Sequence, residues 1–298
     1  MTEILVTGGT GQVGLALQRL AWPEGVTIQA PTRADLDLND TAAIGSYIAS
    51  RPWAAVINAA AYTAVDKAED DVIAAFALNA MAPAALAAAT RKAGVPLVHV
   101  STDYVFDGSK AGLYLEDDPV CPIGVYGASK EAGEQAVRAV NPRHAIVRTA
   151  WVVSPDRANF VKTMLRLGAE RPELRVVADQ RGCPTAAGDL AQALAVIALR
   201  MAQDRDAPTG TFHGVNGGEA TWYDLANYVF DVVARRGQPR PKVTPIETKD
   251  YPTPARRPAN SRLATGRLAQ AYSITLRPWQ VAVEEIVDRL LAATKPIA

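Results

Sequence analysis

The sequence predicts an α/β protein built on a doubly wound parallel sheet, with a smaller C-terminal lobe. Apolar strand-like runs alternate with helix-like segments from Ile4 to Thr149, and a glycine-rich turn follows the first run directly. After Thr149 the alternation loosens, which indicates the lobe. The 298 residues suffice for one large core and a smaller unit. We expect the first unit over residues 1–150, with contributions from about 174–215, and the lobe over 151–173 and 216–298.

Composition excludes several classes of protein. The formal net charge is zero and the basic residues are dispersed, so nucleic acid is not an expected partner. Cys121 and Cys183 lie far apart without metal-ligand spacing, and only three histidines are present, so we expect reduced cysteines and no metal. The N-terminus shows no basic segment followed by an apolar run, and we expect no membrane span. These features predict a soluble, cytoplasmic protein.

The glycine-rich turn predicts a dinucleotide site of the Rossmann type. It follows the buried strand Ile4–Thr7, and its glycines are spaced three apart. Gly8 would allow a tight exit from the strand, and Gly11 would let the backbone approach a pyrophosphate. Gly14 would let the helix Val13–Leu20 pack closely on the sheet. We therefore assign dinucleotide binding to the first unit.

The end of the second predicted strand, Val26–Ala30, bears on which nicotinamide cofactor is bound. Pro31 stands where an NAD-specific protein would present an acidic residue to the ribose. Arg33 follows, and a guanidinium suits a 2′-phosphate, which favours NADPH with NADH also accepted. Two alternatives stay open: Arg33 is a solvated loop charge, or Asp35 or Asp37 serves the ribose.

The next elements extend the alternation. Leu38 is expected against the adenine, before a helix that begins near Thr41. A third strand, Ala54–Asn58, is followed by Ala59, Ala60 and Ala61, whose small side chains leave room for a cofactor over the strand end.

A long alanine-rich helix is predicted over Val72–Ala93, with Gly94 past its end. Asn79, inside this helix, is interpreted as a buried structural amide. The fourth strand, Leu97–Ser101, carries Thr102 and Asp103 past its end, at the sheet edge where such folds bind ligands. Hydroxyl groups at this edge can bind a substrate carbonyl.

Tyr126 and Lys130 place a phenol and an ammonium one helical turn apart, on the predicted helix Gly124–Asn141. A nearby fixed cation favours the ionised phenol, whose ordinary pKa is about 10. This pair is therefore predicted to handle a proton near neutral pH.

The rest of the chain is assigned more coarsely. Strands or sheet-returning segments are expected at Ala145–Arg148, Arg175–Ala178, Ala191–Met201 and Thr211–Val215, helices at Asn159–Glu170, near Thr221–Arg236 and from Trp279, and a Pro/Arg-rich loop at Tyr251–Arg262.

Taken in order, these motifs resemble the extended short-chain dehydrogenases/reductases. More narrowly, the chain is similar to the dTDP-4-dehydrorhamnose reductases of that family. The segments that carry the narrower resemblance are Gly11–Gly14, Thr63–Glu69, Arg148–Val152, Asp179–Thr185 and Tyr251–Ser261.

The resemblance implies reduction of the 4-keto group of dTDP-4-dehydro-6-deoxy-L-mannose, the last step of dTDP-L-rhamnose synthesis for cell-surface polysaccharide. It implies that Thr102, Tyr126 and Lys130 are catalytic, and that Thr102, Asp103 and Trp151 bind the nucleotide sugar. Together, the motifs and the resemblance predict these cofactor-binding residues: Gly8, Thr10, Gly11, Gln12, Val13, Arg33, Asp37, Leu38, Ala59, Ala60, Ala61, Tyr62, Thr63, Val100, Tyr126 and Lys130. A monomer or homodimer is expected.

One departure from this family concerns magnesium. Some members bind Mg²⁺ at a dimer interface through glutamates, and the corresponding positions here are Ala16 and Gly188. Neither offers a carboxylate, so no metal is expected.

Two other functions remain open from the sequence. A redox-neutral sugar-nucleotide epimerase or dehydratase has the same fold, although Tyr104 stands here where a dehydratase has a glutamate. A non-catalytic regulatory subunit is the second alternative, and such a role would not require Thr102, Tyr126 and Lys130 together.

Overall fold

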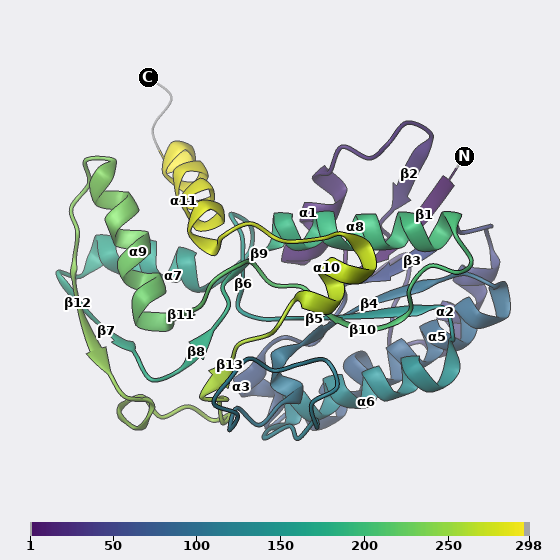
Figure 1. Ribbon diagram of the computed structural model, residues 1–298, viewed down its shortest axis with the longest axis horizontal. Helices are drawn as coiled ribbons and strands as arrows, with labels where there is room; N and C mark the ends of the chain where they lie inside the picture. The colour runs from purple at the N-terminus through teal and green to yellow at the C-terminus, as the bar shows by residue number, and fades with distance from the viewer. Residues whose placement is uncertain (1, 295–298) are drawn as a thin grey trace.

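A computed structural model of the chain describes residues 2–294, so positions 295–298 of the predicted lobe lie outside the described residues. Its centre is a six-stranded sheet in the order β10-β5-β4-β3-β1-β2, in which every pairing is parallel (Figure 1). The strands are β1 (Thr2–Thr7), β2 (Val26–Gln29), β3 (Ala55–Asn58), β4 (Leu97–Thr102), β5 (His144–Thr149) and β10 (Gly210–His213). The predicted doubly wound sheet is confirmed.

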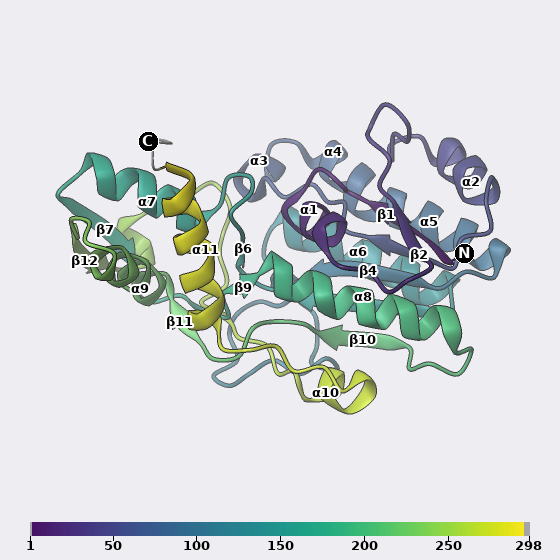
Figure 2. The ribbon, with the colours of Figure 1, turned by 90° about the horizontal axis from the view of Figure 1, so that it is seen from above.

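Helices cover both faces of this sheet because its central strands are buried on both sides. One face packs on α1 (Gln12–Arg19) and α8 (Ala187–Gln203), and the other on α2 (Thr41–Ala49), α5 (Ala82–Ala93) and α6 (Val125–Val140) (Figures 1 and 2). Alternate strand residues separate the two cores: Ile4 and Val6 face α8, whereas Leu5 faces α2 and α5. This two-sided burial is typical of parallel sheets.

The strand order reverses between β1 and β3, and open α/β sheets bind ligands beside such a reversal. The glycine turn after β1 lies at this point. Gly8 has a φ of 76°, and a Cβ there would lie 2.5 Å from the backbone nitrogen of Ala60. A Cβ on Gly14 would lie 2.1 Å from the Gly8 carbonyl oxygen. The tight exit and the close helix packing predicted for these glycines are both present.

The helix predicted over Val72–Ala93 is interrupted. It consists of α4 (Val72–Phe76), a π-helical turn (Ala77–Met81) and α5, and Gly94 ends it in the left-handed conformation. By length and composition alone this stretch is long and apolar enough to cross a membrane, a test that the core helix of a folded protein also passes. In the fold it packs between α2 and α6.

A smaller lobe lies at one end of the sheet (left in Figure 1). It contains α7 (Phe160–Glu170), α9 (Trp222–Arg235) and α11 (Trp279–Thr294), packed against β7 (Glu173–Val177) and β12 (Lys242–Ile246). The prediction that Arg175–Ala178 returns to the large sheet is wrong, because β7 pairs with β12 instead. α8 and β10 do return to the large sheet.

The remaining elements are short. They are α3 (Val65–Ala68), a 3₁₀ turn (Asp103–Val105), β6 (Val152–Val153), β8 (Arg181–Gly182), β9 (Thr185–Ala186), β11 (Ala220–Thr221), a second 3₁₀ turn (Thr248–Asp250), β13 (Asn260–Ser261) and α10 (Gly266–Tyr272).

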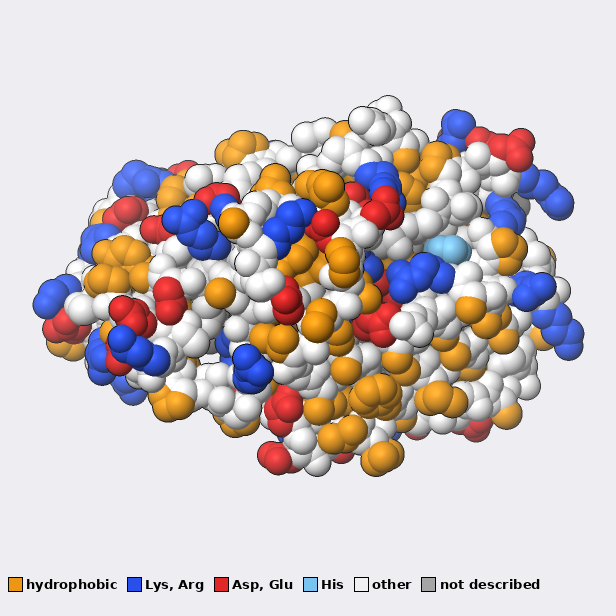
Figure 3. All heavy atoms as spheres, turned by 60° about the horizontal axis from the view of Figure 1, so that its bottom comes forward, with side chains coloured by type: hydrophobic (Ala, Val, Ile, Leu, Met, Phe, Trp, Pro, Cys, Tyr) orange, Lys and Arg blue, Asp and Glu red, His pale blue; other side chains and the backbone are white. Residues whose placement is uncertain are grey.

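Several large apolar side chains are exposed near α4 and the π turn. Ile73 is 83% exposed and Met81 58%. With the underside of the molecule brought forward, hydrophobic side chains gather on the side where α5 and α6 lie (Figure 3). Charged side chains of both signs are mixed over the rest of this face, without a basic stripe.

Candidate active site

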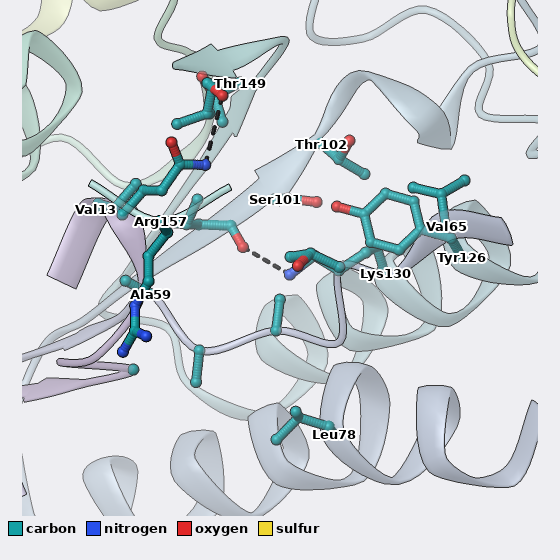
Figure 4. A pocket seen from close by; sticks show the side chains of 18 of the residues that line it. Val13, Ala59, Val65, Leu78, Ser101, Thr102, Tyr126, Lys130, Thr149 and Arg157 are labelled. Carbon is teal, nitrogen blue, oxygen red and sulfur yellow. Dashed lines mark hydrogen bonds between the residues drawn. The ribbon is translucent and has the colours of Figure 1, made fainter. Parts of the chain in front are cut away.

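A cleft of about 960 Å³ lies where the carboxyl ends of the parallel strands meet the lobe (Figure 4). Its volume is at the upper end of the range for small-molecule and cofactor sites. All of the predicted site residues line it except Tyr62.

Tyr62 points away from the cleft. Its hydroxyl donates to a carboxylate oxygen of Asp71 at 3.0 Å, and its backbone is held on both sides by the buried amide of Asn79. Asn79 also donates to the Ser129 hydroxyl at 2.9 Å, so it has the structural role predicted for it. The phenol of Tyr62 is therefore bound to Asp71 and does not line the cleft.

The turn end of the cleft suits a dinucleotide. No side chain caps α1, whose first N–H groups are thus free to bind an anion, and Gly11 is the residue before its first turn. Ala59, Ala60 and Ala61 line the opposite wall without bulk. These features fit a pyrophosphate and an adenosine.

Arg33 and Asp37 lie at the far end of the same wall and form an exposed ion pair, 3.5 Å from nitrogen to oxygen. The carboxylate of Asp37 also accepts hydrogen bonds from the backbone and side chain of Asn39. These bonds, with the Arg33 charge, hold the pKa of Asp37 below its ordinary value. Asp35 is instead bound by Thr32 and does not line the cleft.

Thr102, Tyr126 and Lys130 meet on the floor of the cleft, where the Tyr126 hydroxyl lies on the same side as Thr102 and Ser101 (Figure 4). Burial raises the pKa of Tyr126 to about 12, partly opposed by a hydrogen bond with Thr102. The prediction that Lys130 brings this pKa toward neutrality is therefore wrong. Tyr126 is protonated at pH 7, which is the form that a proton donor requires.

Lys130 is 2% exposed and donates to the backbone oxygen of Val100 at 2.7 Å, marked by the dashed line in Figure 4. Burial lowers its pKa to about 8, and the negative charge of Glu134, one turn further along α6, opposes that shift. Glu134 is itself held by Arg148 through two hydrogen bonds of 2.8 and 2.7 Å. This buried pair fixes a negative charge beneath the ammonium.

Asp103 supports the threonine beside it. It is 2% exposed and accepts the Thr102 hydroxyl proton at 2.9 Å, and burial raises its pKa to about 6. In this orientation the single hydroxyl proton of Thr102 is used by Asp103, and the Thr102 oxygen can still accept a hydrogen bond.

Two tryptophans and a phenylalanine form the wall on the lobe side. Trp151 has a left-handed backbone with a φ of 50°, and its ring stacks on Trp222 with centroids 3.5 Å apart. Phe160 packs on Trp222 at 4.7 Å. A Cβ on Gly182 would lie 2.4 Å from the Trp151 ring, so the glycine leaves space for it. The predicted role of Trp151 is compatible with this wall.

An ion pair joins the two sides of the cleft mouth. Arg257, from the loop before β13, binds Asp66 of α3 with a closest nitrogen-to-oxygen distance of 2.8 Å. Both residues line the cleft. Both residues lie inside segments of family resemblance, but the sequence predicts no role for either. Trp222 and Arg157 carry no local motif and are not predicted as site residues.

The positions discussed for magnesium hold no carboxylate, since Ala16 and Gly188 occupy them. Two acidic residues lie close by, Asp189 on α8 and Glu285 on α11, and Arg277 binds both. Among residues 2–294, no group of three or more His, Cys, Asp and Glu residues is arranged to hold a metal ion.

A glycine turn at the reversal of a parallel sheet, facing a buried Tyr–Lys pair, defines a nicotinamide-dependent short-chain reductase. The chain belongs to the family described as the RmlD substrate binding domain, whose model matches residues 1–292. A dTDP-4-dehydrorhamnose reductase of Sinorhizobium fredii is 46% identical over 294 residues, covering 98% of this chain and 99% of the relative.

Solved structures agree with this assignment. A dTDP-4-dehydrorhamnose reductase of Clostridium acetobutylicum is 38% identical with a TM-score of 0.90, covering 97% of this chain and 100% of that one. The Bacillus anthracis reductase, solved in complex with NADP, is 33% identical with a TM-score of 0.88 and the same coverage.

Proposed function

We propose that this protein reduces the 4-keto group of dTDP-4-dehydrorhamnose to give dTDP-L-rhamnose, with NADPH as the reductant. The observation that carries the proposal is the meeting of Thr102, Tyr126 and Lys130 between the glycine turn and the aromatic wall, in a chain of this family. NADPH, when bound, supplies the hydride. We further propose a cytoplasmic location, where sugar nucleotides are made.

Each catalytic side chain has a distinct task in this scheme. Hydride addition to the carbonyl carbon leaves negative charge on its oxygen, and the Tyr126 hydroxyl donates a proton to that oxygen. Thr102 turns its single hydroxyl proton from Asp103 to the same oxygen and so stabilises the developing charge. The Lys130 ammonium, bound to the Val100 carbonyl and with the negative charge of Glu134 one turn along the helix, keeps further N–H donors that can hold the nicotinamide ribose.

Other residues of the cleft position the two ligands. The Gly8, Thr10, Gly11, Gln12 and Val13 turn receives the pyrophosphate, and the alanines after β3, with Thr63 and Val100, border the rest of the cofactor. Leu38 packs on the adenine and Arg33 binds the 2′-phosphate. Asp103 and Trp151 contact the nucleotide sugar.

The test is an assay of NADPH oxidation with dTDP-4-dehydrorhamnose, with the sugar product identified by nuclear magnetic resonance. One equivalent of NADPH consumed per dTDP-L-rhamnose formed supports the proposal. A redox-neutral epimerase or dehydratase would convert a sugar nucleotide without net cofactor consumption, and a regulatory subunit would convert none. Either outcome refutes the reductase.

A further inference from the structure

A loop from the start of the lobe lies across the glycine turn. We define the 154–159 loop as Ser154–Asn159, which connects β6 to α7. The Ser154 hydroxyl lies 2.8 Å from the side-chain oxygen of Gln12, and the Asn159 amide donates to the same oxygen at 3.1 Å. Gln12 belongs to the turn predicted to receive the pyrophosphate. The loop is therefore tied to the cofactor end of the cleft.

Arg157 is held toward the turn by this loop. Its backbone is left-handed, with a φ of 56°, and the Asn159 amide fixes the surrounding loop by donating to the Ser154 carbonyl at 2.8 Å. Its Nε–H donates to the carbonyl of Thr10 at 2.6 Å. The side chain lines the cleft and extends into it (Figure 4).

The guanidinium of Arg157 still has binding capacity. Its Nε–H is used by Thr10, while no carboxylate within the described residues 2–294 lies within 4 Å of it. Of the other cations that line the cleft, Arg33 and Arg257 pair with the carboxylates of Asp37 and Asp66, and Lys130 donates to the Val100 carbonyl.

The turn itself supplies no positive side chain, because Gly8–Gly14 contains neither lysine nor arginine. Its backbone N–H groups can bind one side of a pyrophosphate, which carries two negative charges. A guanidinium suits such a group because its remaining N–H donors form a planar fork.

We propose that Arg157 binds the pyrophosphate of the dinucleotide from the lobe side, opposite the N–H groups of the turn. This inference rests on the cofactor part of the proposed function and does not depend on the sugar. Because NADPH and NADH share the pyrophosphate, Arg157 sets the affinity for both cofactors equally. Arg33, in contrast, acts on the 2′-phosphate that only NADPH carries.

The experiment is a fluorescence titration of the purified protein with NADPH and with NADH, in the absence of sugar nucleotide. Arg157→Ala is expected to raise Kd for both cofactors by about tenfold, the effect of one partly exposed, charge-assisted contact. Arg157→Lys, which keeps the charge but loses the fork, should give an intermediate Kd. The melting temperature of each variant is measured to confirm that it folds.

Arg19→Ala is the matched control. It breaks the ion pair between α1 and Asp156 of the 154–159 loop, but leaves the Arg157 guanidinium in place. Its Kd for both cofactors should stay within about twofold of the wild type. An equal loss of affinity in Arg19→Ala and Arg157→Ala would show that loop attachment matters and the guanidinium does not, which overturns the inference.

Two further results are decisive. An unchanged Kd in Arg157→Ala overturns the inference while leaving the proposed function intact. A wild type that binds neither cofactor refutes the proposed function itself.

Discussion

Replacing Tyr126 with phenylalanine removes one oxygen atom from the floor of the cleft. The ring packs edge-on against Tyr104, with centroids 5.4 Å apart, and phenylalanine keeps that contact. The Lys130 bond to Val100 does not involve the phenol. The substitution should therefore leave the fold and the cofactor affinity nearly unchanged while removing the proton donor.

The size of the effect follows from the proton balance. A positioned proton donor typically contributes 10²–10⁴-fold, and a hundredfold loss corresponds to about 2.7 kcal/mol of transition-state free energy. Because the pKa of Tyr126 is raised to about 12, essentially every wild-type molecule carries the proton at pH 7. The whole of that contribution is thus lost in the variant, and kcat should fall at least about 100-fold.

The assay compares kcat for NADPH oxidation with the 4-keto substrate in the wild type and in Tyr126→Phe. Tyr114→Phe serves as the control, because the Tyr114 hydroxyl donates to Asp107 and does not line the cleft. Its kcat should stay within about twofold. A Tyr126→Phe enzyme with near-normal kcat and normal NADPH affinity would refute the assignment of this phenol as the donor.

Three other predictions concern the cofactor, magnesium and pH. The wild type should prefer NADPH over NADH by about tenfold in kcat/KM, because Arg33 can exchange its exposed partner Asp37 for the 2′-phosphate. Arg33→Ala should abolish this preference by raising KM for NADPH alone. Equal weakening of both cofactors would contradict the role of Arg33. Chelation of magnesium should leave activity and mass by light scattering unchanged, because Ala16 and Gly188 supply no carboxylate; a chelator-induced shift from dimer to monomer with loss of activity would show that other residues bind the metal. The rate should decline as the pH rises through about 8, where buried Lys130 loses its proton, and this deprotonation should no longer affect the rate about one pH unit or more below that value. A pH–rate profile without that limb would disprove the role of the ammonium.

Local chemistry explains which parts of the fold were predictable. The roles of Gly8 and Gly14 are predicted correctly because a local constraint requires glycine at each position. Gly8 has a positive φ, and a Cβ on Gly14 would collide with the backbone of Gly8. The β7 strand was misplaced because a short apolar run shows that a strand exists, but not which sheet it joins. Its partner β12 was missed altogether.

The residues of the site also fall into two groups, those that follow a local sequence pattern and those that only the fold brings together. Thr102 lies at the end of a predicted strand, and Tyr126 and Lys130 are spaced one helical turn apart. Both patterns are visible in the sequence. Arg157 reaches Thr10 across 147 positions of the chain, so only the fold brings them together. The pKa of Tyr126 was predicted in the wrong direction because spacing gives the distance to a cation but not the cost of burial.

Gly133 of α6 touches the π turn so closely that a Cβ there would lie 2.1 Å from the backbone oxygen of Asn79. The backbones of α6 and the π turn are in direct contact here, without a flexible side chain between them. Sliding or rolling of α6, which carries the proton donor, would press its backbone into the π turn. We therefore expect adjustment to an entering sugar to come from the lobe, while Tyr126 and Lys130 keep their positions beside the sheet.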